Sequence, residues 1–410
     1  MLEEVTASAS IKQRPVIGIM TALVKRCARL LLRWQPEGSL MVELPTGERI
    51  RFGRAGADGE PILKVHSYNL LAKALRRGTI GFAEAYINGD IECSDLLALF
   101  RFFVRNRDRF IKTSRGLFKV RLGDRIAHRY RRNSRLGSRR NISEHYDLSN
   151  DFFRLWLDPE LHYSSGLYSA GAQSLEEAQR AKLELIFDML DLSSGEHLLE
   201  IGCGWGALAR HAARARHVQV TGVTLSREQL AYARKQADAE GLGASCSFLL
   251  QDYRDIRGSF DHIVSVEMIE AVGEDYWPTY FQALNDRLKT GGAAVIQAIT
   301  IDETRFDAYR RKADFIQRYI FPGGLLPTPT AIAHQAALAG LRIERVERFG
   351  LSYARTLREW RKRFEATWPQ AAKLGLDERF RRQWRYYLAY CEAGFLEGVI
   401  DVGIYQLRKA

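Results

Sequence analysis

The stretch that most constrains the fold is Leu198–Leu208, which reads LLEIGCGWGAL. An apolar run followed by closely spaced glycines and a helical pattern predicts a buried strand that turns directly into a helix. The glycines at 202, 204 and 206 permit positive φ and let a ligand approach the backbone, and Glu200 lies where a carboxylate can bond a cationic or polar group. We expect a nucleotide-like ligand here, although the glycine spacing alone fits a plain strand-to-helix turn equally well.

The residues after this turn help to decide between a dinucleotide and S-adenosylmethionine as the ligand. A second apolar run, Val218–Val223, leads to Thr224, where a dinucleotide-binding fold would carry a carboxylate. Thr224, Ser226 and Gln229 can instead hydrogen-bond ribose hydroxyls, and a third strand ends near Asp252, a usual place for adenine contacts. The spacing fits S-adenosylmethionine better than a dinucleotide, because nothing in it suits a pyrophosphate.

Apolar runs and helical patterns alternate from this turn to the end of the chain. Strands are expected near residues 198–202, 218–223, 246–251, 260–266, 293–299, 342–348 and 402–407. The alternation predicts an α/β fold, a doubly wound, seven-stranded, Rossmann-like domain. An insertion over 306–326 and helical segments over about 355–396 lie where such folds build substrate pockets, above the carboxyl ends of the strands.

The length of 410 residues suggests two domains. We expect a small mixed α+β domain over 1–104, a basic linker over 105–140 and the larger domain over 141–410. In the small domain, residues 40–44 and 49–52 predict a hairpin, and residues 67–77 and 82–87 predict helices. Residues 16–32 predict an amphipathic helix, since basic residues interrupt the run well short of bilayer length. Further along, Ser174 and Glu177 predict a helix-opening capping box.

The net charge of +12 is concentrated in one segment. Residues 101–140 hold fifteen Lys and Arg against two acids, so the rest of the chain is close to neutral. Such a block needs an anionic partner or forms a solvated face, and nucleic acid and anionic lipid both offer phosphates. The five cysteines have no metal-ligand or disulfide spacing, which suits a reducing cytoplasm, and we expect no metal.

Motifs spread over most of the chain resemble those of the cyclopropane fatty acid synthase family, methyltransferases that act on unsaturated acyl chains of membrane phospholipids. They are Gly81–Tyr86 with Gly89-Asp90, His145–Leu148 with Asn150-Asp151, Leu199–Gly206, Gly222–Ser226 with Gln229, Met268–Gly273, Tyr319–Gly324 and Tyr353–Leu357.

The resemblance implies two groups of site residues. The S-adenosylmethionine contacts would be Tyr163, Ser164, Gly202, Gly204, Gly206, Thr224, Leu225 and Gln229, beside Glu200 and Asp252 from the spacing. The family's bicarbonate pocket would carry over to Glu270, Ile299 and Tyr353. Ser165 stands where the family usually has cysteine, Gln297 where it has histidine, and Ala271 replaces another histidine.

The implied reaction transfers a methyl(ene) group from S-adenosylmethionine to the double bond of an unsaturated phospholipid acyl chain and forms a cyclopropane ring. The alkene attacks the sulfonium methyl, and the resulting carbocation must lose a proton to a base. The ring of Tyr353 and the carboxylate of Glu270 can stabilise the cation. Ser165 and Gln297 can still bond a bicarbonate, so ring, methyl-branched and methylene products all stay open.

Other functions account for less of the sequence. A small-molecule amine methyltransferase has no evident use for the basic segment, and a base-modifying enzyme would carry an Asn-Pro-Pro-Tyr or Asp-Pro-Pro-Tyr tetrad, which is missing. Binding without catalysis leaves the intact cofactor motif unexplained. We expect a cytoplasmic protein at the periphery of an anionic membrane surface, with phospholipid acyl chains and no nucleic acid as partners, and a homodimer stays open.

Overall fold

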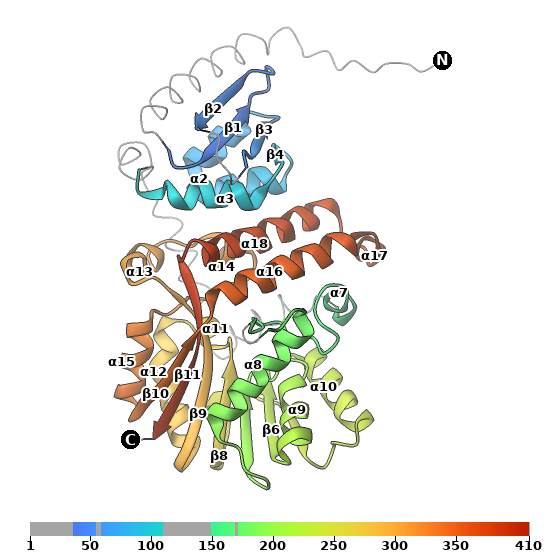
Figure 1. Cartoon of the computed structure of the whole chain (residues 1–410), viewed down its shortest axis with the longest axis vertical. Coiled ribbons are helices and arrows are strands. Elements are labelled where there is room, and N and C mark those ends of the chain that lie inside the picture. The colour runs from blue at the N-terminus through green and yellow to red at the C-terminus, as the bar shows by residue number, and fades with distance from the viewer. Residues whose placement is uncertain (1–35, 55–58, 110–148, 169–170, 410) are drawn as a thin grey trace. The chain divides into compact units, whose positions relative to one another are not determined.

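The computed structural model describes residues 36–54, 59–109, 149–168 and 171–409 (Figure 1). The chain divides into two compact units, Met1–Lys119 and Val120–Ala410. The expected helix over 16–32, most of the basic linker and the motif at His145–Leu148 lie outside the described residues. The domain boundaries expected at 104 and 140 stay predictions.

In its described residues the small unit consists of a four-stranded sheet and two helices, in agreement with the mixed α+β prediction. The predicted hairpin is confirmed, with β1 and β2 antiparallel, while β1 also pairs in parallel with β3. The break predicted between two helices is a kink inside one helix, where Gly78 has φ 57 and ψ −128. The elements are β1 (Ser39–Glu43), β2 (Arg49–Gly53), β3 (Ile62–Val65), α2 (Asn69–Ile87), β4 (Ile91–Cys93) and α3 (Leu96–Arg105), and the sheet order is β2-β1-β3-β4.

The large unit holds a seven-stranded sheet, which confirms the predicted fold class. Its strands are β5 (His197–Ile201), β6 (Gln219–Thr224), β7 (Cys246–Leu250), β8 (Phe260–Val266), β9 (Leu288–Ile301), β10 (Leu341–Arg348) and β11 (Ile400–Lys409), in the order β10-β11-β9-β8-β5-β6-β7. Strands β5 to β9 are parallel, and β11 is antiparallel to both neighbours. The chain order reverses beside β5, so a ligand crevice is expected at the carboxyl ends of β5 and β8.

Helices cover both faces of this sheet (Figure 1). On one face α12 (Trp277–Arg287) and α15 (Pro329–Leu338) pack into a core that includes Leu199, Ile263 and Ile296. The other face is covered by α8 (Leu175–Leu190), α9 (Ala207–Arg216) and α10 (Arg227–Ala239). The capping box predicted at the start of α8 is confirmed, since Ser174 and Glu177 bind each other's backbone N–H. Burial on both faces explains why the central strands read as continuous apolar runs.

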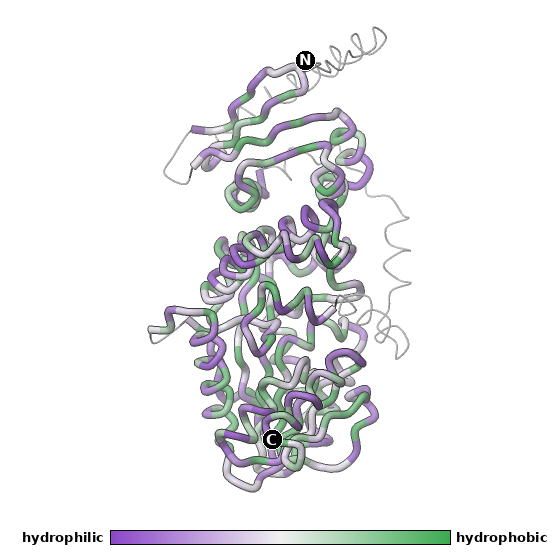
Figure 2. Tube along the Cα trace, turned by 90° about the vertical axis from the view of Figure 1, so that its right-hand side faces the viewer, coloured by the Kyte–Doolittle hydropathy of each residue, from purple (hydrophilic) through white to green (hydrophobic). Residues whose placement is uncertain are grey.

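Helices from the two insertions lie at the carboxyl end of the sheet, where α16 and α18 run side by side (Figure 1). They are α13 (Glu303–Tyr309), α14 (Phe315–Tyr319), α16 (Gly350–Ala366), α17 (Trp368–Lys373) and α18 (Glu378–Leu396), and the short helix α7 (Asn150–Arg154) precedes the sheet. The side chains of Trp156, Trp360 and Trp384 are almost fully buried here. Figure 2 shows apolar residues alternating with polar ones along these helices, as expected for helices with one face packed inward. No helix in the described part of the chain is both long and apolar enough to cross a membrane.

Candidate active site

The glycine turn after β5 adopts the conformation that its sequence predicts. Gly202, Gly204 and Gly206 all have positive φ, at 83, 50 and 80 degrees. A Cβ on Gly206 would lie 2.9 Å from Ala233 Cβ and from the ring of Phe248, so this glycine permits close packing between helix and strand. A Cβ on Gly204 would meet nothing within 4 Å, so open space lies in front of that backbone. A ligand can therefore approach the chain at Gly204.

Glu200, at the end of β5, is a buried carboxylate that lacks a full set of partners. The residue is 4% exposed, and its Oε2 has no hydrogen-bond partner among the described residues. Burial raises its pKa to about 8, against the opposing effects of a backbone hydrogen bond from Ala209 and of the charges on Arg210 and Lys182. An unpaired buried oxygen beside an open glycine turn fits a ligand that presents hydroxyl or ammonium donors, as S-adenosylmethionine does.

The polar residues after β6 and β7 are held in place by their neighbours. Thr224 Oγ1 donates to Gln229 Oε1 at 2.9 Å, and the Gln229 N–H donates to Ser226 Oγ at 3.2 Å. The three residues predicted to bond ribose therefore lie together, and Leu225 follows Thr224 in the chain. Asp252 accepts from Arg254 through Oδ1 at 2.8 Å and through Oδ2 at 2.6 Å. Its carboxylate is therefore already engaged by an arginine at the position where the sequence predicts an adenine contact.

The segment before α8 contributes Tyr163 and Ser164. The hydroxyl of Tyr163 lies 3.0 Å from that of Tyr387, and Ser164 Oγ accepts from Lys182 Nζ at 2.7 Å. Lys182 is 1% exposed, and burial lowers its pKa to about 8 although Glu267 and other carboxylates favour its charge. The sequence analysis missed this lysine, because one lysine in an amphipathic helix resembles any solvated one.

Three predicted pocket residues converge on a carboxylate that the sequence analysis did not single out, Glu267. Its Oε1 accepts from the Ser165 N–H at 2.9 Å and from Gln297 Nε2 at 2.7 Å, and its Oε2 accepts from the Tyr353 hydroxyl at 2.6 Å. Burial raises the pKa of Glu267, against the lowering effect of these donors and of Lys182. The signal that could have found it is its place directly after the fourth strand, at the crevice.

Glu270 and Ile299 form a second cluster in the same pocket. Glu270 Oε1 accepts from the Ile299 N–H, and its Oε2 is buried with no hydrogen-bond partner within the described ranges. Burial raises the pKa of Glu270 to about 8, and the negative charge of Glu267 raises it further. Two neighbouring carboxyl groups thus share a poorly solvated space, an arrangement that favours holding and moving a proton.

The residues present do not fit a bound bicarbonate. The donors that such an anion would need, from Ser165, Gln297 and Tyr353, are all directed at Glu267. The hydroxyl of Ser165 turns to the Gly166 carbonyl at 2.8 Å and is not free either. The expectation that Ser165 and Gln297 would bond bicarbonate therefore conflicts with the structure, because a side chain already holds that position.

Aromatic rings form a wall beside the carboxylates. Tyr353 stacks on Phe395 with centroids 4.5 Å apart and meets the edge of Trp360 at 6.1 Å. Tyr163 lies 5.5 Å from Trp360 and 6.4 Å from Phe321. Such a wall is apolar enough for a hydrocarbon chain, and its ring faces stabilise positive charge.

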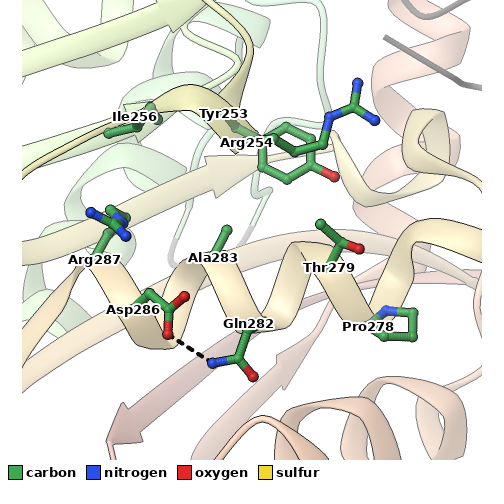
Figure 3. A pocket seen from close by; sticks show the side chains of 9 residues that line it. All are labelled: Tyr253, Arg254, Ile256, Pro278, Thr279, Gln282, Ala283, Asp286 and Arg287. Carbon is green, nitrogen blue, oxygen red and sulfur yellow. Dashed lines mark hydrogen bonds between the residues drawn. The ribbon is translucent and has the colours of Figure 1, made fainter.

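A separate hollow of about 420 Å³ lies between Tyr253–Ile256 and α12 (Figure 3). It is lined by polar groups such as Gln282, which donates to Asp286 at 2.7 Å. None of the residues predicted for the cofactor or for catalysis lines it. We therefore do not include this hollow in the candidate site.

Comparison with known proteins agrees with this geometry. The family model described as mycolic acid cyclopropane synthetase matches residues 133–405. The chain is 41% identical over 352 residues to the tuberculostearic acid methyltransferase of Mycobacterium tuberculosis, covering 83% of this chain and 82% of the relative. It is 36% identical over 355 residues to the cyclopropane-fatty-acyl-phospholipid synthase of Escherichia coli, covering 84% and 85%.

Solved structures give the same assignment. A cyclopropane synthase from Mycobacterium tuberculosis superposes with a TM-score of 0.62 at 33% identity, covering 66% of this chain and 97% of that one. A mycolic acid cyclopropane synthase solved with SAH and CTAB gives a TM-score of 0.62 at 32% identity, covering 66% and 98%. The cofactor of this chain is therefore S-adenosylmethionine, and its substrates are acyl chains. The chain belongs to the cyclopropane fatty acid synthase family of S-adenosylmethionine-dependent methyltransferases.

Proposed function

We propose that this enzyme transfers a methyl(ene) group to the double bond of an unsaturated acyl chain of a membrane phospholipid and closes a cyclopropane ring. The observation that carries the proposal is the pair of carboxyl groups, Glu267 and Glu270, enclosed beside an aromatic wall near the glycine turn. Methylation of an alkene needs this combination, because it creates a cation that must lose a proton in a place that excludes water.

Each group of residues has a role in this reaction. S-adenosylmethionine, when bound at the turn of Gly204 beside Glu200, supplies an electrophilic methyl group. The rings of Tyr353 and Trp360 stabilise the carbocation left on the acyl chain, because aromatic faces attract cations. The carboxyl pocket then takes a proton from the transferred methyl, and the released C–H electron pair closes the ring.

Two observations support a phospholipid as the substrate. The Escherichia coli relative, named for phospholipid substrates, aligns with 84% of this chain. The basic segment, with fifteen Lys and Arg in residues 101–140, suits attraction to an anionic membrane surface. We infer that the enzyme works at the periphery of the cytoplasmic membrane, where it draws the acyl chain towards the aromatic wall.

A second product class is favoured by a specific feature, the occupation of the anion pocket by Glu267. A change in the base changes how fast the cation loses its proton, and a slower loss leaves time for a hydride shift. Deprotonation of the methyl group then gives a methylene branch without ring closure. The relative named tuberculostearic acid methyltransferase, 41% identical, is named for methyl transfer and not for ring formation.

The two products are distinguished by direct analysis of lipids. Purified enzyme is incubated with S-adenosylmethionine and vesicles of a monounsaturated phospholipid, and the fatty acid methyl esters are separated by gas chromatography. A cyclopropane ester and a methylene ester have equal mass, so carbon NMR identifies the product. The double variant Glu267→Gln, Glu270→Gln, which removes both carboxyl groups, is expected to turn over about a hundred-fold more slowly or worse, the usual scale for lost proton transfer or charge stabilisation. Unmethylated lipid with the wild type would refute the proposed function.

A further inference from the structure

We infer that Glu267 is a built-in replacement for a bound anion and is the base that removes the proton after methyl transfer. The inference rests on the proposed function and assigns its proton-accepting step to one residue. It also means that this enzyme works without bicarbonate.

The hydrogen bonds around Glu267 are those of a captured anion. Three donors from separate parts of the chain point at its two oxygens, namely the Ser165 N–H, Gln297 Nε2 and the Tyr353 hydroxyl. An ionised carboxylate has about four lone-pair sites, so three are engaged and one remains on Oε2. That remaining site can accept a proton, while the other three hold the carboxylate still.

The backbone conformation of Glu267 supports a functional role for this residue. Its φ is 50 degrees, in the left-handed region that residues with a Cβ seldom adopt. Its N–H donates to the Gln297 carbonyl at 2.8 Å, while the amide of the same glutamine holds its carboxylate. An unfavourable conformation of this kind persists only where the surroundings fix it, and it is common at functional sites.

The neighbouring charges leave Glu267 suited to act as a base. Burial raises its pKa, which strengthens it as a proton acceptor, while the buried Lys182 favours its ionised form. Glu270 has a pKa of about 8, so near neutral pH it is mostly protonated and does not place a second negative charge in the pocket. The three hydrogen bonds and Lys182 thus favour the ionised form of Glu267 against the effect of burial, while burial and the charge of Glu267 favour the neutral form of Glu270.

The proposed step balances within these groups. The alkene electron pair forms the new bond to the methyl carbon, and the carbon–sulfur electron pair leaves with sulfur. Glu267 Oε2 then takes one proton from the transferred methyl. The electron pair of that C–H bond closes the ring, or, where a hydride shift has first moved the cation to the methyl-bearing carbon, it forms the double bond of a methylene branch. The carboxylate becomes a carboxylic acid and later releases the proton, so no further reactant is needed.

The test compares two variants that change the same side chain in different ways. Glu267→Ala removes the carboxylate and leaves space between the three donors, whereas Glu267→Gln fills that space with a neutral amide. In buffer depleted of carbon dioxide, the wild type is expected to keep full activity and both variants to lose a factor of about a hundred or more. Added bicarbonate or formate should restore much of the activity of Glu267→Ala and none of that of Glu267→Gln.

A binding measurement gives a readout independent of turnover. Titration calorimetry should detect bicarbonate binding to Glu267→Ala and none to the wild type, with S-adenosylmethionine affinity unchanged in both. The control is Glu344→Gln. It removes an exposed carboxylate on β10 that is paired with Arg342 and with Arg408 of β11, and it should match the wild type in both assays.

Several outcomes would overturn the inference and leave the proposed function standing. They are a wild type that methylates lipid only when bicarbonate is added, a Glu267→Gln variant with near-normal activity, and a Glu267→Ala variant that folds and binds cofactor but is restored by no small carboxylate. A wild type that methylates no lipid under any condition would instead refute the proposed function itself.

Discussion

The hydroxyl of Tyr353 donates a 2.6 Å hydrogen bond to Oε2 of Glu267, 86 residues away in the sequence. The bond joins α16, one of the helices at the carboxyl end of the sheet, to the first residue after β8. The ring that we propose to stabilise the cation is thus fixed by the same carboxylate that we propose to take the proton. A change at Tyr353 therefore affects cation stabilisation and the acidity of Glu267 together.

Replacement of Tyr353 by phenylalanine is expected to shift the pH dependence of turnover. The tyrosine hydroxyl lowers the pKa of Glu267 by bonding to its ionised form, so its removal raises that pKa. A base must be ionised to act, and turnover falls as the pH drops through its pKa. The acidic limb of the kcat profile should therefore move to higher pH. The matched control is Tyr386→Phe, a buried tyrosine that stacks on Tyr390 in α18, and a similar shift there would contradict the assignment.

The raised pKa of Glu270 predicts a pH-dependent contribution to the free energy of unfolding. Its pKa in the folded protein is about 8 against an ordinary 4.5, so the folded state holds a proton that the unfolded chain releases. This contribution is fully present below pH 4.5 and is lost as the pH rises to 8. The free energy of unfolding should fall over that range more steeply for the wild type than for Glu270→Gln, as measured by urea unfolding at several pH values. Parallel curves would show that Glu270 ionises normally.

The open space at Gly204 predicts loss of cofactor binding when a larger side chain is placed there. A Gly204→Val variant directs its methyl groups into the space that we assign to the ligand, and its affinity for S-adenosylmethionine should fall at least about ten-fold, a change worth about 1.4 kcal/mol. Gly241→Val is the matched control, because Gly241 also has positive φ and open space but lies in the turn after α10. Equal affinities by calorimetry would place the cofactor elsewhere.

Ser165 and Gln297 are the two pocket positions that differ from the family pattern. Replacing them by cysteine and histidine is not expected to restore the use of bicarbonate. In Ser165→Cys with Gln297→His, the carboxylate of Glu267 still occupies the anion position. Addition of Glu267→Ala to this pair vacates it, and activity should then depend on bicarbonate and shift towards the cyclopropane product. Gas chromatography and carbon NMR of the esters measure both effects. A double variant that already responds to bicarbonate would contradict this reading of the pocket.

The basic segment predicts salt-sensitive attachment to anionic membranes. Each Lys or Arg near such a surface contributes about 1 kcal/mol, so several of the fifteen suffice for reversible binding. Sedimentation with vesicles should show binding to anionic and not to neutral lipid, and the bound fraction should fall as salt screens the charges. Equal binding to both vesicle types would mean that the segment has another partner.

Much of the fold could be predicted because burial leaves a clear pattern. The central strands are apolar runs between turns, and each of the seven lies within a few residues of its expected range. The strands Ile62–Val65 and Ile91–Cys93 were missed, because three or four residues are too short to show a period. A helical pattern also cannot tell a kink at Gly78 from a break between two helices.

The site was harder to predict for a different reason. Spacing placed Glu200 and the glycines correctly at the turn, since local geometry determines them. Glu267 and Glu270 are three residues apart in one loop, and which of them reaches the donors depends on a left-handed backbone that a glutamate does not signal. The donors come from segments about a hundred residues away on one side and thirty to ninety on the other. Only the assembled sheet brings them together.

Because Glu267 is part of the chain, the rate of lipid modification should not depend on the supply of a diffusible base. A base that diffuses in must be bound again whenever it leaves, and its occupancy follows its concentration outside. A side chain is present at a high and constant effective concentration, and the entropy of placing it is lost once, when the chain folds. Lipid modification by this enzyme should therefore proceed at the same rate in cells starved of carbon dioxide as in cells supplied with it.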